Sequence, residues 1–388
     1  MQRRNRLTAV GILVCALVLG ALLSACGSGS SSTSSETTSE SEAAAKETTT
    51  ASSEGSGVSS KAFEEFSAPI AWTGPNTPVT PPPGKSITVI ICGSQGITCV
   101  RVGEGVEAAG KAVGYNVKVV DGQSSPTVWN QAVQSAVAEK TDGIVLAAVP
   151  PALVSGALEK AKAAGIPVAA TLSVLGPPVD VKVELNRKDI AAANSAWIAE
   201  DSGGNAKVLV VRDDEFPETK VTSDAYGPDL EAECSGCTVE DEVEFTLALA
   251  SQRLAGEVAQ ALKQHPEINY IVQPFDTVTT FVEQGIAEAG KNGQVKIVGL
   301  GADPPSFEAM AKGTMAESFG TPAQWMGWDA LDGLIRTFAG KPVPKLDQET
   351  QSNYDVPERY VTTETPEPGP SGWPDFDYQS KFESLWGK

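Results

Sequence analysis

Few residues in this sequence are suited to covalent chemistry. His265 is the only histidine among 388 residues, which excludes multi-histidine metal sites and leaves a single candidate base for serine or cysteine hydrolysis. It precedes Pro266 at the expected end of a helix, where an imidazole interacts well with the last carbonyl groups. Walker A and nucleophile-elbow patterns do not occur. We therefore expect His265 to be structural and the chain to be neither an enzyme nor the carrier of a cofactor or metal.

The cysteines form two close pairs. Cys234 and Cys237 are expected between the end of a helix and a strand from Thr238 to Val243, whereas the reactive pair of a thiol oxidoreductase opens a helix after a strand. We interpret this pair as a disulfide that tightens a loop. Cys92 and Cys99 bracket the loop after the first expected strand, and a disulfide is favoured there over buried free thiols. A four-cysteine zinc site is the disfavoured alternative.

The N-terminus has the features of an export signal. Arg3, Arg4 and Arg6 precede an apolar run over residues 7–23, for which the alternative is an uncleaved membrane anchor. The sequence Leu23-Ser24-Ala25-Cys26 resembles the bacterial lipobox. The resemblance implies that residues 1–25 are removed, that Cys26 is lipidated, and that the protein is extracytoplasmic and anchored to the cell membrane.

The charge balance limits the partners. With 49 acidic and 29 basic side chains the net charge is −20, which disfavours nucleic acid and favours neutral or cationic ligands. Residues 26–84 begin with Ser, Thr and Glu and end with a Pro-rich stretch, so we expect a disordered tether followed by a lead-in, with folded sequence from about Lys85.

The remaining sequence alternates between two kinds of segment. Short, nearly continuous apolar runs predict strands buried on both faces of parallel sheets at 87–91, 117–120, 143–147, 168–170, 208–211, 270–272 and 295–298. Segments with apolar residues at helical spacing lie between them. The fold class is therefore α/β with parallel sheets, and about 300 folded residues suggest two lobes.

Loops at the carboxyl ends of parallel strands converge, which makes them the expected ligand site. In the first half of the chain these loops supply Ser94, Gln95, Thr98, Cys99, Gln123, Thr171 and Ser173. In the second half they supply Arg212, Asp214, Phe216, Phe275, Asp276 and Asp303. The alternatives are helix caps for the polar groups, lobe packing for the aromatic rings and an internal ion pair for Arg212.

From Ser86 to about Pro344 the chain resembles the type I periplasmic binding proteins of the ribose-binding family. Ordered, individually weak motifs carry the resemblance: Ser86-Ile87-Thr88-Val89-Ile90-Ile91, Val113-Gly114-Tyr115-Asn116-Val117, Thr141-Asp142-Gly143-Ile144-Val145, Ala161-Lys162-Ala163-Ala164-Gly165-Ile166-Pro167-Val168, His265-Pro266-Glu267-Ile268-Asn269-Tyr270 and Lys296-Ile297-Val298-Gly299.

The resemblance implies two doubly wound lobes joined by a three-segment hinge, with crossings near Asn186, Gln324 and Gln351. The lobes would comprise residues 85–185 plus 325–348 and 186–324 plus 349–365, followed at 366–388 by a Pro-rich linker and a tail helix. The protein would be a monomer that closes over one small molecule, leaves it unaltered and delivers it to an ABC permease with a cytosolic ATPase.

The family's sugar contacts are only partly present. Its Asp-Arg pair falls at Leu172-Ser173, and an Asn falls at Phe275, while Gln324 matches. With Trp325 as a further stacking surface, the expected ligand is a sugar, a polyol or a less polar, aromatic compound.

Two alternatives remain. The same fold could serve a signalling partner, or a cell-surface enzyme could use Asp276 and Asp303 or a cysteine pair. A DNA-binding repressor is excluded by the export signal and by the lack of a helix-turn-helix before Lys85.

Overall fold

The structure is a computed structural model that describes residues 66–365 and 376–388. All of these residues belong to one structural unit. The export signal, Cys26 and the tether up to residue 65 lie outside the described residues. Among the helices that are described, none combines the length and the hydropathy needed to cross a membrane.

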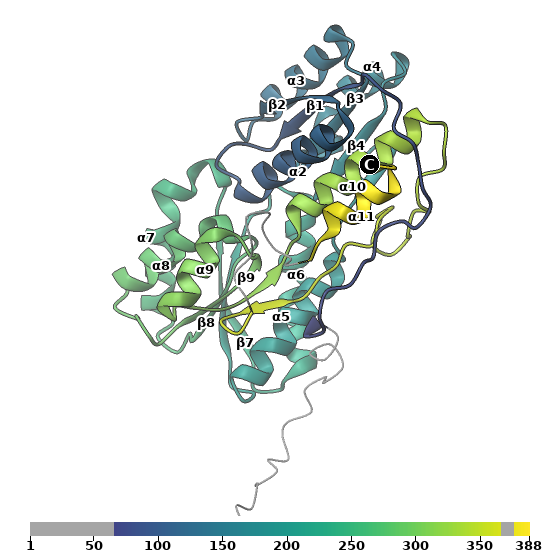
Figure 1. The fold of residues 1–388 in the computed structure, drawn as a ribbon. Helices are drawn as coiled ribbons and strands as arrows, with labels where there is room; N and C mark the ends of the chain where they lie inside the picture. The colour runs from purple at the N-terminus through teal and green to yellow at the C-terminus, as the bar shows by residue number, and fades with distance from the viewer. Residues whose placement is uncertain (1–65, 366–375) are drawn as a thin grey trace, which may run out of the picture. The chain divides into compact units, whose positions relative to one another are not determined.

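The first lobe is a five-stranded parallel sheet with helices on both faces (Figure 1). The strand order is β2-β1-β3-β4-β5, and every pair is parallel. Its strands are β1 (Ser86–Ile91), β2 (Asn116–Asp121), β3 (Gly143–Ala147), β4 (Val168–Thr171) and β5 (Val181–Val183). Its helices are α2 (Ile97–Val113), α3 (Pro126–Glu139), η1 (Pro151–Val154), α4 (Ser155–Ala163) and α10 (Ala323–Phe338).

The second lobe contains a six-stranded sheet of order β11-β10-β9-β8-β6-β7, in which only the β10–β11 pair is antiparallel. Its strands are β6 (Lys207–Arg212), β7 (Thr238–Glu244), β8 (Tyr270–Val272), β9 (Lys296–Gly301), β10 (Met315–Gly320) and β11 (Tyr360–Thr362). Its helices are α5 (Arg187–Asp201), α6 (Pro217–Glu233), η2 (Leu247–Leu249), α7 (Ala250–Gln264), η3 (Asp276–Val278), α8 (Thr279–Glu288) and α9 (Pro304–Lys312). The predicted α/β class with two parallel-sheet lobes is confirmed.

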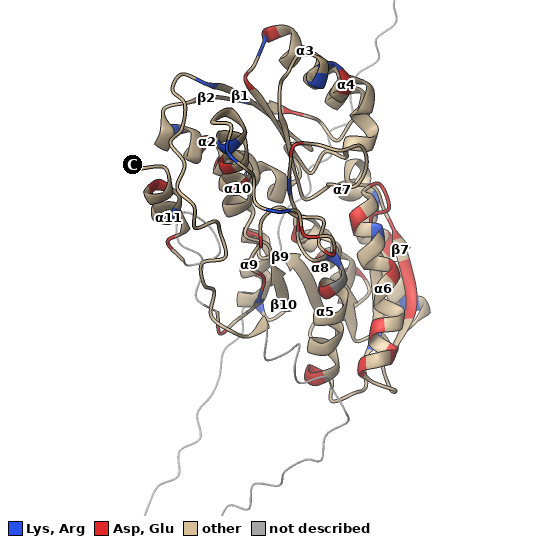
Figure 2. Ribbon diagram, turned by 90° about the vertical axis from the view of Figure 1, so that its right-hand side faces the viewer, with Lys and Arg blue, Asp and Glu red and all other residues tan. Residues whose placement is uncertain are grey.

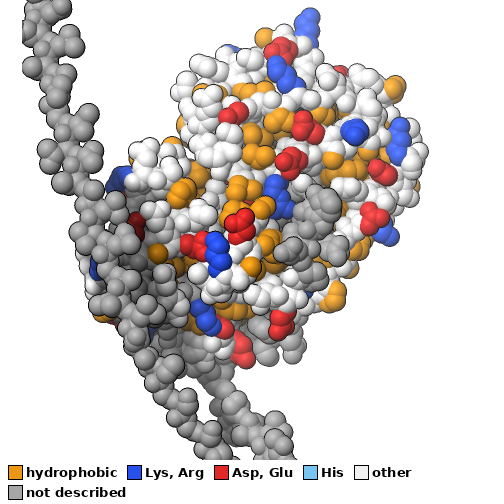
Figure 3. Space-filling model, turned by 60° about the vertical axis from the view of Figure 1, so that its left-hand side comes forward, with side chains coloured by type: hydrophobic (Ala, Val, Ile, Leu, Met, Phe, Trp, Pro, Cys, Tyr) orange, Lys and Arg blue, Asp and Glu red, His pale blue; other side chains and the backbone are white. Residues whose placement is uncertain are grey.

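Two edge strands differ from the buried interior strands. The sequence predicted that residues 117–120 are buried on both faces, but β2 forms an edge of its sheet and Val119 is 37% exposed. At the edge of the other sheet, β7 carries four acidic residues, and in Figure 2 acidic positions recur along the ribbon of β7 and α6. Charged edges discourage pairing with a strand of another molecule. The face shown in Figure 3 has acidic and basic side chains interspersed.

The chain passes between the lobes three times. The first crossing joins β5 to α5, the second joins β10 to α10, and the third runs back towards β11. The first and third crossings are bonded together, because the backbone NH of Asn186 donates to Glu358 Oε1 at 2.9 Å and that of Glu184 donates to Ser352 Oγ at 3.0 Å. The first and third connecting segments therefore run side by side.

Buried carboxylates lie at these crossings. Burial raises the pKa of Glu184 to about 7, against the opposing effect of Arg187. Burial also raises the pKa of Glu358 to about 8, although its bond from the Asn186 backbone NH lowers it, and nearby Asp189 adds to the rise. The native protein therefore holds protons on the hinge that the unfolded chain releases.

The C-terminal helix α11 (Tyr378–Leu385) docks on α10 beside the first lobe (Figure 1). Phe382 is fully buried there, and the ring of Trp386 stacks on Trp328 with centroids 5.3 Å apart. The Trp386 indole also donates to Asp332 Oδ1 at 2.8 Å. The tail thus contributes apolar packing and a buried hydrogen bond to the first lobe.

The lead-in also packs on this lobe. The Trp72 ring stacks on Trp325 at 5.5 Å, and the backbone NH of Val79 donates to the carbonyl of Leu385 at 3.0 Å. Folded sequence therefore begins before Lys85, the start that the sequence predicted. The Pro-rich composition concealed this, because isolated aromatic residues between prolines show no periodicity.

Removal of the Phe382 ring tests the docking of the tail. We expect Phe382→Ala in the full chain to lower the free energy of unfolding by about 3–5 kcal/mol, since a fully buried aromatic side chain is lost. Urea denaturation measures the change. The matched control is Lys381→Ala on the exposed side of α11, which should change it by less than about 0.5 kcal/mol. Equal midpoints for the two variants would show that the tail is not docked.

The hinge carboxylates predict the pH dependence of stability. Because the folded pKa of Glu358 lies above its ordinary 4.5, its contribution is complete below pH 4.5 and is lost as the pH rises through about 8. We expect the free energy of unfolding to fall between pH 6 and 8, by on the order of 1–2 kcal/mol from this residue. Glu358→Gln keeps an acceptor for Asn186 and should flatten the dependence. Stability that rises with pH in the wild type would contradict this.

Candidate ligand site between the lobes

A cavity of about 80 Å³ lies between the lobes, at the carboxyl ends of the strands. We call it the interlobe cavity. The first lobe lines it with Cys92, Gly96, Thr98, Cys99, Ala148 and Leu172. The second lobe lines it with Phe216, Thr219, Leu247, Pro274, Phe275, Thr277 and Leu300, and the crossings add Leu185, Arg187 and Thr321. The two lobes therefore contribute almost equally, as a site that assembles on closure requires.

The loop after β1 forms one wall and is closed by the predicted disulfide between Cys92 and Cys99. Gly96 lies against the bridge, and a Cβ atom there would approach the two sulfur atoms to 2.6 and 2.7 Å. Any side chain at this position would displace the bridge or the loop. The wall is thus built from a disulfide and bare backbone, which is a rigid and apolar surface.

Above this wall a buried ion pair joins the lobes. Arg101 Nη1 of α2 lies 2.7 Å from Asp303 Oδ1, which precedes α9, and the side chains are 8% and 0% exposed. Thr98 Oγ1 donates to Asp303 Oδ2 at 2.8 Å, and the backbone NH of Ile97 donates to Thr277 Oγ1 at 3.2 Å. We call the contacts among Thr98, Arg101 and Asp303 the clasp.

A second set of contacts crosses between the loop after β4 and the start of α6. Ser173 Oγ donates to Glu218 Oε2 at 2.9 Å, and the backbone NH of Leu175 donates to Glu218 Oε1 at 3.0 Å. Glu218 is 2% exposed. Its charge is stabilised by these two neutral donors.

Arg187 is the charged residue that lines the cavity. Its Nε donates to Glu184 Oε1 at 3.1 Å, and its Nη2 donates to the Leu172 carbonyl at 2.9 Å. Neither bond uses Nη1, so the guanidinium of this lining residue retains donor capacity. Because Glu184 belongs to the first crossing, this side chain connects the cavity wall to the hinge.

Four of the predicted ligand residues line the cavity and two more lie in the contacts around it. Thr98, Cys99, Phe216 and Phe275 form part of the lining. Ser173 and Asp303 are occupied by the other lobe. The Phe275 ring is held edge-on against Phe245 at 5.9 Å.

Other predicted residues lie away from the cavity. Ser94, Gln95 and Gln123 are exposed, and Thr171 is fully buried within the first sheet. Arg212 forms ion pairs with Asp214, Asp224 and Glu242 within the second lobe, at 3.0, 2.6 and 2.7 Å. Arg212 therefore forms internal ion pairs, as the alternative interpretation predicted, and does not contact the cavity.

Asp276 is buried in the second lobe instead of facing the cavity. Its carboxylate accepts bonds from the backbone NH groups of Leu300 and Ala302 at 3.0 and 2.9 Å, and from the hydroxyls of Ser306 and Ser318. Burial raises its pKa, and the serine hydroxyls oppose the rise. It holds β9 and the start of α9 in place, which positions Asp303 for the clasp.

Gln324 and Trp325 begin α10 and face away from the cavity. Gln324 donates to Glu104 of α2 at 3.0 Å. Trp325 is 0% exposed and its ring stacks on Tyr378 of the tail at 5.0 Å. The stacking surface that the sequence predicted for a ligand is thus occupied by the protein's own tail.

Sequence reasoning missed the clasp arginine and most apolar lining. Arg101 lies inside a helix of small residues, far along the chain from Asp303, so no local spacing indicates it. Ala148 and Leu172 directly follow β3 and β4, and Leu300 lies near the end of β9. All three were within reach of the rule that found Thr98. That rule considered polar and aromatic side chains, whereas six of the sixteen residues that line this cavity are aliphatic.

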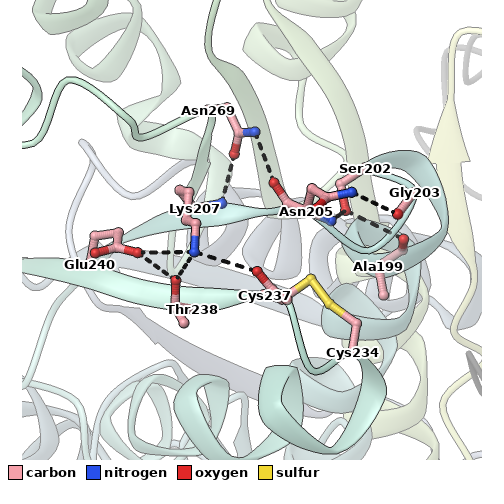
Figure 4. The surroundings of a disulfide bond; sticks show 11 residues. Ala199, Ser202, Gly203, Asn205, Lys207, Cys234, Cys237, Thr238, Glu240 and Asn269 are labelled. Carbon is pink, nitrogen blue, oxygen red and sulfur yellow. Dashed lines mark hydrogen bonds and ion pairs between the residues drawn. A yellow bond between two sulfur atoms is a disulfide. The ribbon is translucent and has the colours of Figure 1, made fainter. Parts of the chain in front are cut away.

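The second predicted disulfide, Cys234–Cys237, lies on the loop between α6 and β7 (Figure 4). Lys207 beside it donates to Thr238 Oγ1 at 2.9 Å and reaches Glu240 at 3.5 Å. The bridge joins the helix end to the strand start, as predicted for a structural bond.

His265 caps the end of α7, where its backbone NH donates to the Ala261 carbonyl. Its ring lies 3.4 Å from Glu267 and, together with Glu240, forms a grouping of metal-ligand type on the surface of the second lobe. Glu240 there already accepts from Thr238 and Lys207. His265 is not among the residues that line the interlobe cavity.

A larger groove of about 770 Å³ lies along the hinge, between the lead-in and the third crossing. It is lined by residues such as Asn76, Arg336, Lys345 and Asp355. Of the strand ends that the structure describes, that of β5 alone reaches this groove, through Glu184. Strand ends of both lobes converge on the interlobe cavity, which is therefore the candidate ligand site.

The sequence matches the model of the periplasmic binding protein domain over residues 87–342. Comparison with curated proteins finds no match. Among solved structures, a sugar ABC transporter protein from Yersinia enterocolitica is 17% identical, with a TM-score of 0.67 over 81% of this chain and 99% of that one. An ABC transporter solute-binding protein from Agrobacterium vitis with bound allitol is 19% identical, with a TM-score of 0.63 over 73% and 96%.

A third structure, an ABC sugar transporter subunit from Rhodobacter sphaeroides, is 20% identical, with a TM-score of 0.63 over 72% of this chain and 98% of that one. At these identities the similarity concerns the fold. The family and these structures are solute-binding proteins and not enzymes, as predicted. The matched domain covers all residues that line the interlobe cavity and most of both lobes, and this chain belongs to the periplasmic binding protein family.

Proposed function

We propose that this chain is the lipid-anchored receptor of an ABC importer, which captures a small solute between its lobes by hinge closure and releases it to a membrane permease driven by a cytosolic ATPase. The interlobe cavity carries this proposal. It is assembled from both lobes and all of its walls are completed only when the lobes meet. Such a site couples occupancy to closure, which a permease can recognise.

The chemistry of the lining supports binding without turnover. The cysteines in the lining are joined in a disulfide, and the threonine hydroxyls lie without a neighbouring histidine or lysine base among the lining residues. Asp276 and Asp303, the acids of the enzyme alternative, are each saturated by protein donors. The solute is expected to leave the cavity chemically unaltered.

The N-terminal sequence supports the location. A lipid on Cys26 would anchor a monomer outside the cytoplasm, and the Ser- and Thr-rich residues after it give reach toward a permease. The ribose-binding subfamily stays a prediction, because the solute contacts of that subfamily are only partly present.

A panel of solutes tests the receptor function. Purified protein is screened by thermal unfolding against allitol, D-arabinose, D-allose, D-ribose, cyclohexanol and phenol. A true ligand at 100 times its Kd should add about 2.7 kcal/mol to the free energy of unfolding. Mass spectrometry of the recovered solute should show no change in mass. A chemically altered solute would refute the receptor function and favour an enzyme.

The clasp predicts how the lobes separate. Hydrogen bonds to charged groups contribute about 1.5–3 kcal/mol, so Arg101→Gln should shift the protein toward an open form by about that amount. Small-angle scattering should detect a larger radius of gyration without added solute. The matched control is Arg253→Gln, which removes an exposed ion pair within α7 and should leave the radius unchanged. Equal radii for both variants would exclude the clasp as a closing contact.

A further inference from the structure

Two of the four threonine hydroxyls that line the interlobe cavity, those of Thr98 and Thr219, already donate to other protein groups. Thr98 donates to Asp303, Thr219 donates to the carbonyls of Asp213 and Phe216, and Thr277 accepts from Ile97. A hydroxyl has one hydrogen to donate. Among the lining threonines only Thr277 and Thr321 keep a hydroxyl hydrogen for a solute, so a solute with many hydroxyls would bury unpaired polar groups.

The rest of the lining is apolar, with Arg187 as the exception. Leu172, Leu247 and Leu300 approach from both lobes, and Phe216 and Phe275 present aromatic rings. Arg187 supplies a donor that its bonds to Glu184 and Leu172 do not use. The lining thus matches a solute with an apolar body and one hydrogen-bond acceptor.

Charge around the cavity disfavours an anion. Arg101 is balanced by Asp303 and Arg187 by Glu184. Glu218, next in sequence to the lining residue Thr219, is buried and bonded to neutral donors alone. Because Glu184 is partly protonated near pH 7, these charges nearly cancel, and the site offers no net positive charge to a carboxylate or phosphate. A cation would lack a carboxylate in the lining itself, which leaves an uncharged solute.

The cavity volume sets the size. The space of about 80 Å³ is small, which favours a compact solute with few non-hydrogen atoms. A six-membered ring with one substituent is such a solute.

We infer that, if the receptor function proposed above holds, its solute is a compact, uncharged ring compound with a single hydrogen-bond acceptor, such as a cyclic or aromatic alcohol, and not a sugar. The ring lies between the aliphatic side chains and the rings of Phe216 and Phe275. The acceptor faces Arg187.

A matched pair of solutes tests this inference. Cyclohexanol and myo-inositol share a six-membered carbon ring but carry one and six hydroxyls. Isothermal titration calorimetry on the full chain, with phenol as the aromatic and cyclohexanecarboxylate as the charged counterpart, compares their affinities. We expect cyclohexanol or phenol to bind at least about tenfold more tightly than myo-inositol, D-ribose or cyclohexanecarboxylate.

A variant locates the binding. Phe275→Ala should weaken cyclohexanol or phenol at least about tenfold, because it removes a ring from the lining. The matched control is Phe281→Ala in α8 of the same lobe, where the ring is partly buried but does not line the cavity. If Phe275→Ala fails to fold, Phe216→Leu replaces it, with the same expected direction.

The outcomes separate this inference from the receptor function. Tighter binding of myo-inositol or D-ribose would overturn the solute class and leave the receptor function intact. Absence of binding by both ring alcohols, or equal losses in Phe275→Ala and Phe281→Ala, would likewise overturn the solute class. A solute that binds and is recovered altered would overturn the receptor function instead.

Discussion

The buried ion pair between Arg101 and Asp303 constrains the rest of the site. Charges removed from water must be paired, because an orphaned buried charge is strongly destabilising. The pair is complete only when the lobes touch, so its formation is tied to closure. It also engages the Thr98 hydroxyl. The polar groups of the cleft thus serve contact between the lobes, and the interior that they enclose is left to apolar side chains and Arg187.

The fold could be predicted from the sequence because most of its strands coincide with uninterrupted apolar runs. Residues 143–147 and 270–272 predicted β3 and β8 with their observed bounds. The apolar run at 117–120 predicted β2 but not its exposure to solvent, because a strand's place at the edge of a sheet depends on which strands pair with each other. The short β5 was not predicted, since three residues carry too little pattern.

The site was harder to predict, because side-chain direction depends on tertiary contacts. Phe216 and Phe275 follow strand ends and do line the cavity. Asp276 follows a strand end too, yet it points into its own lobe, where Gly299 leaves room for it: a Cβ atom there would lie 2.1 Å from its Oδ1. Trp325 packs against the C-terminal tail instead of the cavity. The pairing of Arg101 with Asp303 could not be predicted, because it depends on the topology that places α2 beside the start of α9.

Separation of the closing contacts from the lining has a thermodynamic consequence. A ligand shifts a conformational equilibrium only by its differential affinity for the two states. Here the clasp and the contacts to Glu218 stabilise the closed form without any solute. The solute therefore needs to supply only the remaining part of the free energy that favours closure. Arg187 links the cavity lining to the hinge, because it lines the cavity and is paired with Glu184 at the first crossing. An acceptor placed at Arg187 would therefore act on the hinge directly, while the apolar body sets which solute fits.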